Sequence, residues 1–246
     1  MAKNGIVLAG GTGSRLFPLT QVVNKHLLGV NGKFVIDYPI NTLKNMGCED
    51  ITVILGGEHF AQVVAYLGDG SRYGLNLNYV YQVSPKGIAH AINLCKKFVS
   101  DSSEFAVILG DNIFENNIVW DVPCWKTNSS AQIVLAEHSE LTRFGVASCD
   151  ALGQIKKIEE KPAVLDPTFS NYAITGCYLF TPQFFEYFKE LQPSARGEFE
   201  IADIIRKYHE DSNLSYTKTT GLWSDAGMHE SIAFVNNYFY SKSHPI

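Results

Sequence analysis

The stretch that decides the fold is Gly5-Ile6-Val7-Leu8-Ala9-Gly10-Gly11-Thr12-Gly13-Ser14-Arg15, close to the start of the chain. It passes directly from an apolar, β-prone run into a loop with three glycines, and short apolar runs of this kind form buried strands. Glycines let backbone N–H groups approach phosphate oxygens, and Arg15 adds a cation suited to phosphate. The stretch therefore predicts a strand followed by a phosphate-binding loop, although the glycines alone also suit a tight strand-to-helix turn.

Two common phosphate-binding loops do not fit this stretch. A dinucleotide-binding fingerprint that includes Gly11 and Gly13 would need a glycine at position 16, where the chain has Leu16. A P-loop would end in Gly-Lys-Ser or Gly-Lys-Thr, which does not occur here. A second cation follows at Lys25, and we expect it to fold back toward the same loop.

The first 110 residues alternate between strand-like and helical patterns. Strands are predicted at residues 5–8, 51–55, 75–82 and 105–109, and apolar residues at helical spacing predict helices at residues 35–46, 60–67 and 88–99. Repeated strand-helix-strand units form a mostly parallel, Rossmann-like sheet with helices on both faces. Ligands of such sheets bind at the carboxyl ends of the strands.

The pattern changes after Asp111. Strand-like runs follow one another closely at residues 131–138, 144–148, 154–159 and 172–180, which predicts added mixed or antiparallel strands. Thr181-Pro182 predicts the start of a helix, with threonine as cap and Phe185, Phe188 and Leu191 on its buried face. Further helices are predicted at residues 200–210 and 229–240. Without internal repeats or a Pro-, Gly- or Ser-rich linker, residues 1–246 are expected to form one α/β domain.

Composition excludes several classes of protein. The formal net charge is −5, so no overall basic character favours nucleic acid or anionic membranes as partners. The five cysteines are scattered without a C-x-x-C pair, which argues against a disulfide framework or a zinc site (Cys48, Cys95, Cys124, Cys149 and Cys177). No apolar run approaches the ~20 residues of a membrane span, and no signal peptide is recognisable. We expect a cytoplasmic protein without a membrane anchor.

Three charged residues are candidates for a phosphate site. Asp111 follows a strand directly and would place a carboxylate at the ligand-binding edge, where Mg²⁺ favours oxygen ligands, although Gly-Asp-Asn is also an ordinary turn. Asp225 is the second metal candidate, with helix capping as its alternative role. Lys161 ends a run of charges that is more often a solvated strand edge. None of the seven histidines has the spacing of a metal motif or a nucleophile partner, so no catalytic histidine is indicated.

Nine short motifs occur in one order along the chain. They are Leu8-Ala9-Gly10-Gly11-Thr12-Gly13-Ser14-Arg15-Leu16, Asn24-Lys25-His26-Leu27-Leu28, Gly87-Ile88-Ala89-His90-Ala91, Leu109-Gly110-Asp111-Asn112, Arg143-Phe144-Gly145, Glu159-Glu160-Lys161-Pro162, Asn171-Tyr172-Ala173-Ile174-Thr175-Gly176, Pro193-Ser194-Ala195-Arg196-Gly197-Glu198 and Trp223-Ser224-Asp225-Ala226-Gly227. Because the motifs have this order and spacing, the chain resembles the short form of the glucose-1-phosphate thymidylyltransferases. The resemblance extends from Gly5 to about Val235. The ordered series makes chance turns and charge runs poor explanations of the individual motifs.

The resemblance implies a role for each matching residue. It implies that dTTP and glucose 1-phosphate are the substrates, Mg²⁺ the cofactor and dTDP-glucose and pyrophosphate the products. Residues 1–111 would form the nucleotide-binding half, with contacts from Leu8, Gly10, Gly11, Thr12, Gly13, Arg15, Lys25, Gln82, Gly87 and Asp111. Residues 112–246 would form the sugar-phosphate-binding half, with contacts from Asn112, Gly145, Glu160, Lys161 and Tyr172. Arg15, Lys25 and Lys161 would be catalytic, and Asp111 and Asp225 would bind the metal.

The chain departs from the family pattern at four positions. Gly29 replaces the proline of Leu-Leu-Pro-Val, Phe34 replaces a proline, Asp37 stands where an aromatic is usual, and His90 where glutamine is frequent. The alternatives are therefore a related nucleotidyltransferase that uses UTP, CTP or another sugar 1-phosphate, or a catalytically silent nucleotide-sugar-binding protein. The family further implies a homo-oligomer, suspected to be a tetramer. Because the chain ends at Ile246, the distal regulatory site of the long-form enzymes is not expected.

Overall fold

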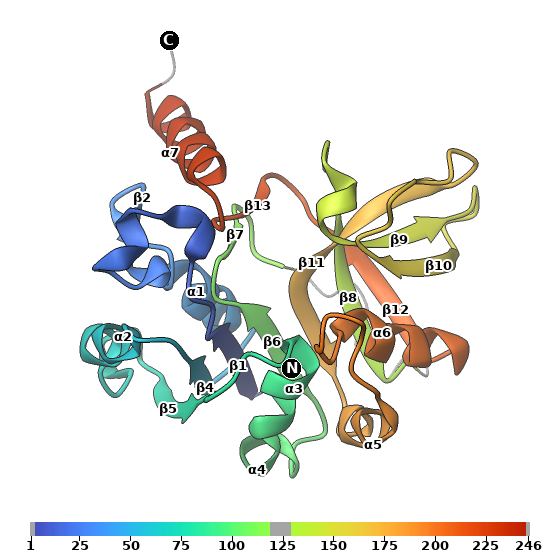
Figure 1. Cartoon of the computed structure of the whole chain (residues 1–246), viewed down its shortest axis with the longest axis horizontal. Coiled ribbons are helices and arrows are strands. Elements are labelled where there is room, and N and C mark those ends of the chain that lie inside the picture. Colours follow the sequence, from blue (N-terminus) through green and yellow to red (C-terminus); the bar gives the residue numbers. More distant parts are fainter. Residues whose placement is uncertain (1–2, 119–128, 245–246) are drawn as a thin grey trace.

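The computed structural model describes residues 3–118 and 129–244, so Cys124 lies outside the described residues. Four parallel strands form the N-terminal part of a large sheet, in the spatial order β5, β4, β1, β6 (Figure 1). Their bounds are β1 (Asn4–Ala9), β4 (Asp50–Leu55), β5 (Asn76–Tyr81) and β6 (Phe105–Leu109). The near-continuous apolar runs of β1 and β6 suit strands covered on both faces.

The second half of the chain extends the same sheet with mostly antiparallel pairs and one parallel pair. The connecting strand is β11 (Ser170–Phe180), whose residues 177–180 pair with β6 and whose residues 170–173 pair with β9. The other strands are β8 (Ala131–Ala136), β9 (Gly145–Cys149), β10 (Ile155–Glu160) and β12 (Leu214–Lys218). β8 lies between β11 and β12, and β10 pairs with β9 at the sheet edge. A single long strand therefore joins the parallel half to the antiparallel half.

Within the described residues, two small ribbons and seven α-helices surround this sheet. The ribbons pair β2 (Gly29–Val30) with β3 (Lys33–Phe34) and β7 (Asn112–Phe114) with β13 (Trp223–Asp225). The helices are α1 (Asp37–Asn45), α2 (Phe60–Leu67), α3 (Ile88–Leu94), α4 (Lys96–Val99), α5 (Gln183–Glu190), α6 (Ile201–Glu210) and α7 (His229–Ser243). None of the helices in the described residues has the length and apolar character needed to cross a lipid bilayer.

Side chains of β1 alternate between two buried clusters on opposite faces of the sheet. Ile6 packs in a cluster with apolar residues of α3, α5 and α6, whereas Val7 packs in a cluster with α1 and α2. This alternation follows from the two-residue period of a strand. The prediction of an α/β fold with a mostly parallel sheet and added antiparallel strands is confirmed.

Several predicted details are wrong. The helix predicted at residues 88–99 is two helices, because Cys95 adopts φ −89° and ψ 2° and interrupts the helical hydrogen bonds. Thr181 does not cap α5 with its side chain, since Pro182 occupies the N-cap position and the buried Thr181 hydroxyl has no hydrogen-bond partner among the described residues. Strands β2, β3, β7, β12 and β13 were not predicted. β7 and β13 are three residues long, too short to produce a recognisable pattern.

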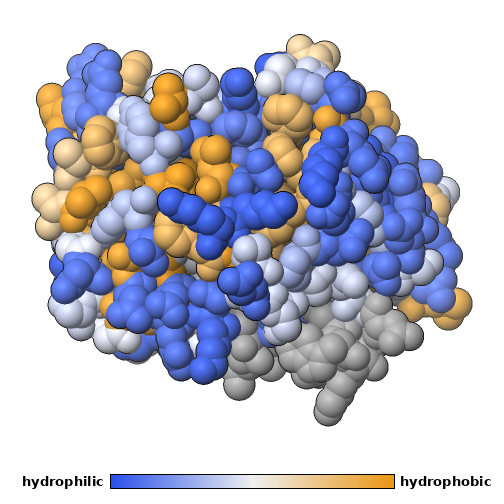
Figure 2. All heavy atoms as spheres, turned by 90° about the horizontal axis from the view of Figure 1, so that it is seen from below, coloured by the Kyte–Doolittle hydropathy of each residue, from blue (hydrophilic) through white to orange (hydrophobic). Residues whose placement is uncertain are grey.

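Some large apolar side chains remain exposed, including those of Phe60, Tyr81 and Val83 near the ends of α2 and β5. On the face seen from below, hydrophobic residues gather on the left and in the centre, on the side where α2 and β5 lie (Figure 2). Hydrophilic residues cover much of the remainder of that face. This distribution is ordinary for a globular protein, in which much of the accessible surface is apolar.

Candidate active site

A cleft lies at the carboxyl ends of the parallel strands, where the fold class predicts a ligand site. One part of it is lined by Leu8, Gly10, Gly11, Lys25, Gln82, Gly87 and Asp111. The adjoining part is lined by Arg15, Asp111, Asn112, Gly145 and Asp225. Glu160 and Lys161 line both parts, so the two compartments form one continuous space. Residues of the parallel and antiparallel halves thus face each other across the cleft.

Lys25 folds back against the glycine loop, as its position in the sequence suggested. A Cβ atom at Gly11 would lie 3.1 Å from the Lys25 ammonium nitrogen, and one at Gly13 would lie 2.9 Å from the Lys25 Cβ. Gly13 also has φ 72°, in the left-handed region that glycine adopts most easily. These glycines therefore leave room for the lysine. Thr12 lies in a neighbouring hollow beside Gly10 and Gly11, and Gly13 does not line the cleft among the residues described for it.

Asp111 is held in its ionised form by cations next to it. Burial alone would raise the pKa of this carboxyl, but the Lys25 ammonium, 2.6 Å from Oδ2, leads the interactions that lower the pKa to about 2. His26 lies beneath this pair with its ring fully buried, and a hydrogen bond joins its Nδ1 to the Asn24 side-chain oxygen. Burial and the charge of Lys25 lower the pKa of His26 to about 3, so its ring is neutral. The site therefore holds an anionic Asp111 at neutral pH.

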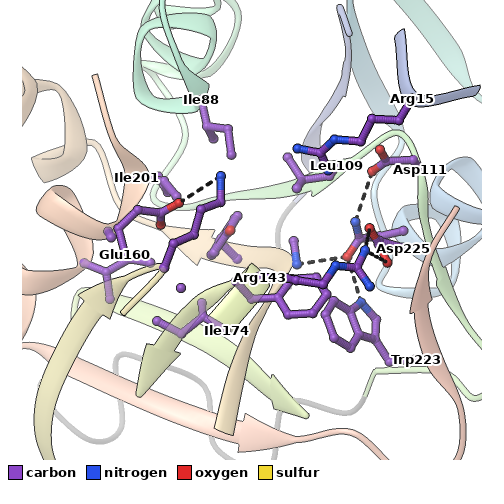
Figure 3. Close-up of a pocket in the computed structure, with 18 residues that line it drawn as sticks. Arg15, Ile88, Leu109, Asp111, Arg143, Glu160, Ile174, Ile201, Trp223 and Asp225 are labelled. Atoms are coloured by element: carbon purple, nitrogen blue, oxygen red, sulfur yellow. Dashed lines mark hydrogen bonds and ion pairs between the residues drawn. The ribbon is translucent and has the colours of Figure 1, made fainter. Parts of the chain in front are cut away.

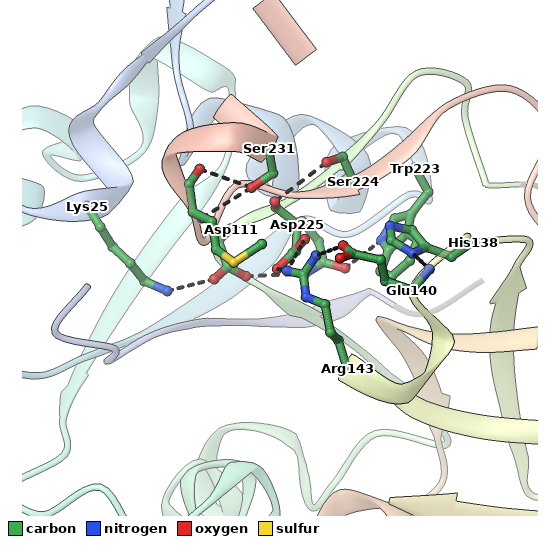
Figure 4. Close-up of polar contacts among 11 residues, drawn as sticks. Lys25, Asp111, His138, Glu140, Arg143, Trp223, Ser224, Asp225 and Ser231 are labelled. Carbon is green, nitrogen blue, oxygen red and sulfur yellow. Dashed lines mark hydrogen bonds and ion pairs between the residues drawn. The ribbon is translucent and has the colours of Figure 1, made fainter. Parts of the chain in front are cut away.

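Asp225 reaches the same place from a distant part of the sequence through the ribbon of β7 and β13. In this antiparallel pair Asp225 lies opposite Asn112, and the Ala226 amide donates to the Asp111 carbonyl oxygen at 2.7 Å. A Cβ atom at Gly227 would lie 3.2 Å from Asp225 Oδ2 and 3.8 Å from Asp111 Oδ2. The two carboxylates therefore converge on one point, and Figure 4 shows the contact of Lys25 with Asp111 and that of Arg143 with Asp225.

Asp225 is not a helix cap, because Met228 occupies the N-cap position of α7. Arg143 donates to its carboxylate instead, with Nη2 3.1 Å from Oδ2. Burial raises the pKa of Asp225 to about 6, the Arg143 guanidinium opposes this rise, and the negative charge of Asp111 adds to it. The raised pKa shows that a second negative charge is costly here without a further cation.

Asn112 holds the ribbon in position. Its side-chain oxygen accepts hydrogen bonds from the Trp223 indole nitrogen at 2.8 Å and from the Gly176 amide at 2.9 Å. The Asn112 side-chain nitrogen donates to Asp111 Oδ1 at 3.2 Å. This buried side chain thus links β7, β11 and β13 and orients the first carboxylate, while it also lines the cleft.

Glu160 and Lys161 form the opposite wall at the end of β10. Figure 3 shows Glu160 across the cleft from Asp225 and Arg15. Lys161 adopts φ 45°, a strained conformation for a side chain with a Cβ, and its amide donates to the Phe144 carbonyl at 3.0 Å. Burial raises the pKa of Glu160, although the charge of Lys161 acts against this rise. The Glu160 carboxylate lies close to Gly145, where a Cβ would approach its Oε2 to 3.3 Å.

Tyr172 is a further predicted site residue that does not line the cleft. Its hydroxyl accepts a hydrogen bond from Lys218 at 2.8 Å. Arg143 and Arg196 do line the cleft, and the sequence analysis gave neither a role. Both arginines lie inside the quoted motifs, and Arg143 is two residues before Gly145. An arginine in a motif close to a predicted phosphate site was the signal from which their role could have been predicted.

Gly87 shapes the cleft through its backbone conformation and close packing. It has φ 92°, and a Cβ atom there would lie 2.5 Å from the Phe199 carbonyl oxygen. We expect Gly87→Ala to lower the free energy of unfolding by about 2–4 kcal/mol, because left-handed strain adds to overlap with the backbone. Gly32→Ala is the matched control, since Gly32 has φ 73° and nothing within 4 Å of an added Cβ. It should cost only about 1 kcal/mol. Urea unfolding of both variants measures the difference, and equal losses would contradict the packing explanation.

Comparisons with known proteins agree in family and fold. The family model for nucleotidyl transferases matches residues 4–242. A glucose-1-phosphate thymidylyltransferase of Neisseria meningitidis is 38% identical over 233 residues, which cover 93% of this chain and 79% of that protein. The low-salt glycan biosynthesis nucleotidyltransferase Agl11 of Haloferax volcanii is also 38% identical, and the match covers 94% of this chain but only 64% of that longer protein.

Two solved structures share the fold. A Bacillus anthracis protein provisionally named glucose-1-phosphate thymidylyltransferase, crystallised with sucrose, superposes with a TM-score of 0.87 at 43% identity, covering 96% of this chain and 94% of that one. A UDP-glucose pyrophosphorylase in complex with UDP-glucose superposes with a TM-score of 0.83 at 26% identity, covering 98% of this chain and all of the other.

Proposed function

The chain belongs to the nucleotidyl transferase family, and on that basis we propose that it transfers dTMP from dTTP to α-D-glucose 1-phosphate, releasing pyrophosphate. The observation that carries the proposal is the charge distribution of the cleft. Two converging carboxylates lie at its floor, and cations approach from both walls. A site that must hold two polyanions together needs this distribution of charges.

The reaction needs alignment of two anions more than proton transfer. The phosphate oxygen of a sugar 1-phosphate is already anionic at neutral pH, so it can attack the α-phosphorus of dTTP without a general base. As it attacks, the bond from the α-phosphorus to the bridging oxygen breaks and pyrophosphate departs. Because no general base is needed, the reaction does not require a catalytic histidine. His26, which is buried and neutral, therefore need not act as a base.

The cations of the chain then have separate roles. Lys161, in the half formed by residues 112–246, would bind and orient the phosphate of the sugar 1-phosphate. Arg15 and Lys25, in the half formed by residues 1–111, would stabilise the triphosphate and the departing pyrophosphate. Glu160 would accept hydrogen bonds from sugar hydroxyls. Glu160 is placed for this role because it lines both parts of the cleft.

The residues present fit a magnesium ion. Asp111 and Asp225 supply oxygen ligands that converge on one point, and no group of three Asp, Glu, His or Cys side chains suited to a metal occurs within residues 3–118 and 129–244. Mg²⁺ is commonly held by one or two carboxylates and completed by substrate phosphates. When bound, the ion would neutralise charge on the α-phosphate and make its phosphorus a better electrophile. Burial, the main cause of the raised pKa of Asp225, is a penalty on its charged form that such an ion would offset.

Two alternatives have specific observations behind them. The likeness to a UDP-glucose pyrophosphorylase supports UTP as the nucleotide, and thymine differs from uracil by one methyl group, worth only ~1–3 kcal/mol in an apolar pocket. The likeness to Agl11 leaves another sugar phosphate open. A silent nucleotide-sugar-binding protein is a weaker alternative, because such a protein needs no carboxylate pair beside the phosphates.

A substrate panel tests the proposal. The protein is incubated with Mg²⁺, with dTTP, UTP, dCTP or dATP, and with glucose, galactose, mannose or N-acetylglucosamine 1-phosphate, and pyrophosphate release is measured. We expect the highest kcat/KM for dTTP with glucose 1-phosphate, and lower but measurable activity with UTP. Activity confined to dCTP would remove the base assignment, and activity confined to another sugar would remove the sugar assignment. Product-bound crystals would show both groups directly.

A further inference from the structure

Gln82 and His90 face each other beside the glycine loop. Gln82 follows β5 directly and is buried, and its amide nitrogen Nε2 lies 3.2 Å from His90 Nδ1, on the first turns of α3. Its amide oxygen lies on the other side, because a Cβ atom at Gly10 would be 3.1 Å from Oε1. Gly10 and Gln82 both line the cleft. The two ends of the Gln82 amide therefore have different surroundings, with the nitrogen against α3 and the oxygen against the loop.

The orientation of this amide depends on an acceptor at position 90. With the Gln82 amide nitrogen as donor, His90 Nδ1 accepts, which requires a neutral ring with its proton on Nε2. Burial, helped by the nearby charge of Lys86, lowers the pKa of His90 and keeps the ring neutral at pH 7. The neutral ring can therefore accept from Gln82.

The His90 ring is itself held in place. It stacks on Phe199 with ring centroids 6.2 Å apart and an interplanar angle of 22°. The Phe199 backbone is fixed to the start of α3, since its amide donates to the Lys86 carbonyl at 2.9 Å and its carbonyl accepts from the Ala89 amide at 3.2 Å. Gly87 packs closely against the same Phe199 carbonyl and so forms part of this contact. Two chain segments thus fix the side chain that faces Gln82.

We propose that His90 is a specificity-determining positioning residue, which accepts from the Gln82 amide nitrogen and so presents the Gln82 amide oxygen to the nucleobase. The inference rests on the proposed function and on the expectation, implied by the family resemblance, that Gln82 contacts the nucleotide. Thymine and uracil carry a hydrogen on N3 and can donate it to this oxygen. Cytosine has an unprotonated N3, so the same oxygen would face a second acceptor. A buried acceptor left without a donor is penalised, which gives the site its preference for a 2,4-dioxo pyrimidine.

Three substitutions at position 90 separate this role from packing. His90→Phe keeps an aromatic ring against Phe199 but removes the acceptor. His90→Glu supplies an acceptor only, and His90→Lys supplies a donor only, which would favour the reversed Gln82 amide with its NH₂ group toward the base. The dissociation constants of dTTP and dCTP are measured by calorimetry with Mg²⁺ and without sugar phosphate, so no turnover occurs. Both ligands carry the same triphosphate, so the ratio of the two constants cancels any general effect of charge or stability.

We expect wild type and His90→Glu to bind dTTP at least about tenfold more tightly than dCTP, equivalent to ~1.4 kcal/mol. His90→Phe should lose at least most of this preference, and His90→Lys should move the ratio further toward dCTP. A purely structural role would weaken both nucleotides equally and leave the ratio unchanged. Equal ratios for the glutamate and lysine variants would overturn the inference, as would a wild type without preference. Selective dTTP binding without transfer to any sugar phosphate would instead remove the proposed reaction and leave the role of His90 supported.

Discussion

Asp111→Asn is expected to lower kcat about a thousandfold, which corresponds to ~4 kcal/mol of lost transition-state stabilisation. In the proposed mechanism this carboxylate is one of two protein ligands of Mg²⁺. The other is Asp225, whose pKa is raised to about 6, so Asp111 is the more fully ionised of the two carboxylates. Asparagine keeps an oxygen within reach of Lys25 but carries no charge. The variant should also need more Mg²⁺ for half-maximal activity, and pyrophosphate release measured over a magnesium titration checks both effects.

The fold should survive this substitution, although with lower stability. Lys25 is mostly buried, and an ammonium group without its counter-charge is unfavourable there. Thermal unfolding should therefore remain cooperative with a lower midpoint. Asp150→Asn is the matched control, because Asp150 also pairs with a lysine, Lys156 at 3.1 Å, but in a turn that does not line the cleft. Full turnover in the Asp111→Asn protein would remove this residue from the metal site.

Lys161→Asn is expected to lower kcat/KM for the sugar 1-phosphate by about a thousandfold, or ~4 kcal/mol, because a charge-assisted contact to the reacting phosphate is lost. Asparagine suits the test, since it tolerates the left-handed backbone that Lys161 adopts at φ 45° better than most side chains. The loss would then report the ammonium group rather than backbone strain. The KM for dTTP should change less than about threefold, because the triphosphate is assigned to Arg15 and Lys25.

Lys157→Asn is the control for this substitution. Lys157 lies on β10, the strand that Lys161 follows, with 54% of its side chain exposed, and pairs with Glu159 at 2.8 Å. Initial rates at varied sugar phosphate and at varied dTTP give the two KM values for each variant. If Lys161→Asn raised the KM for dTTP as much as that for the sugar phosphate, Lys161 would be a general anion contact and its assignment to one substrate would be wrong.

Much of the fold could be predicted from the sequence because its strands carry strong local signals. The runs around Ile6 and Val107 are apolar on both faces and bounded by turns, which is typical of central parallel strands. The strands of the β7–β13 ribbon are short, and what stabilises them lies far away in the sequence. The Asn112 side chain, for example, bonds to Trp223 and Gly176. Such long-range contacts have no periodic signature in either partner.

The sequence indicated several of the charged residues that line the cleft, but not all of the ion pairs that they form. Asp111 follows a parallel strand and Lys25 follows the glycine loop, where the fold class predicts ligands, whereas the role of Lys161 was implied only by the family resemblance. The ion pair between Arg143 and Asp225 depends on β7 and β13 coming together, which the sequence analysis did not predict. Tyr172 was assigned by motif, but its hydroxyl pairs with Lys218. Tyr172 lies two residues before Ile174, which lines the cleft, so it shares a face of β11 with the site but lies outside the lining residues.

The β7–β13 ribbon also sets the order in which a newly synthesised chain can become active. The four parallel strands β1, β4, β5 and β6 have all been made once Leu109 is synthesised, yet the segment that carries Asp225 follows much later in the chain. Bringing residues 112 and 225 together closes a long loop, and such closure is slow compared with local contacts. A nascent chain could therefore have most of its sheet while still lacking one of the two carboxylates. Catalytic competence should be among the last properties the folding chain acquires.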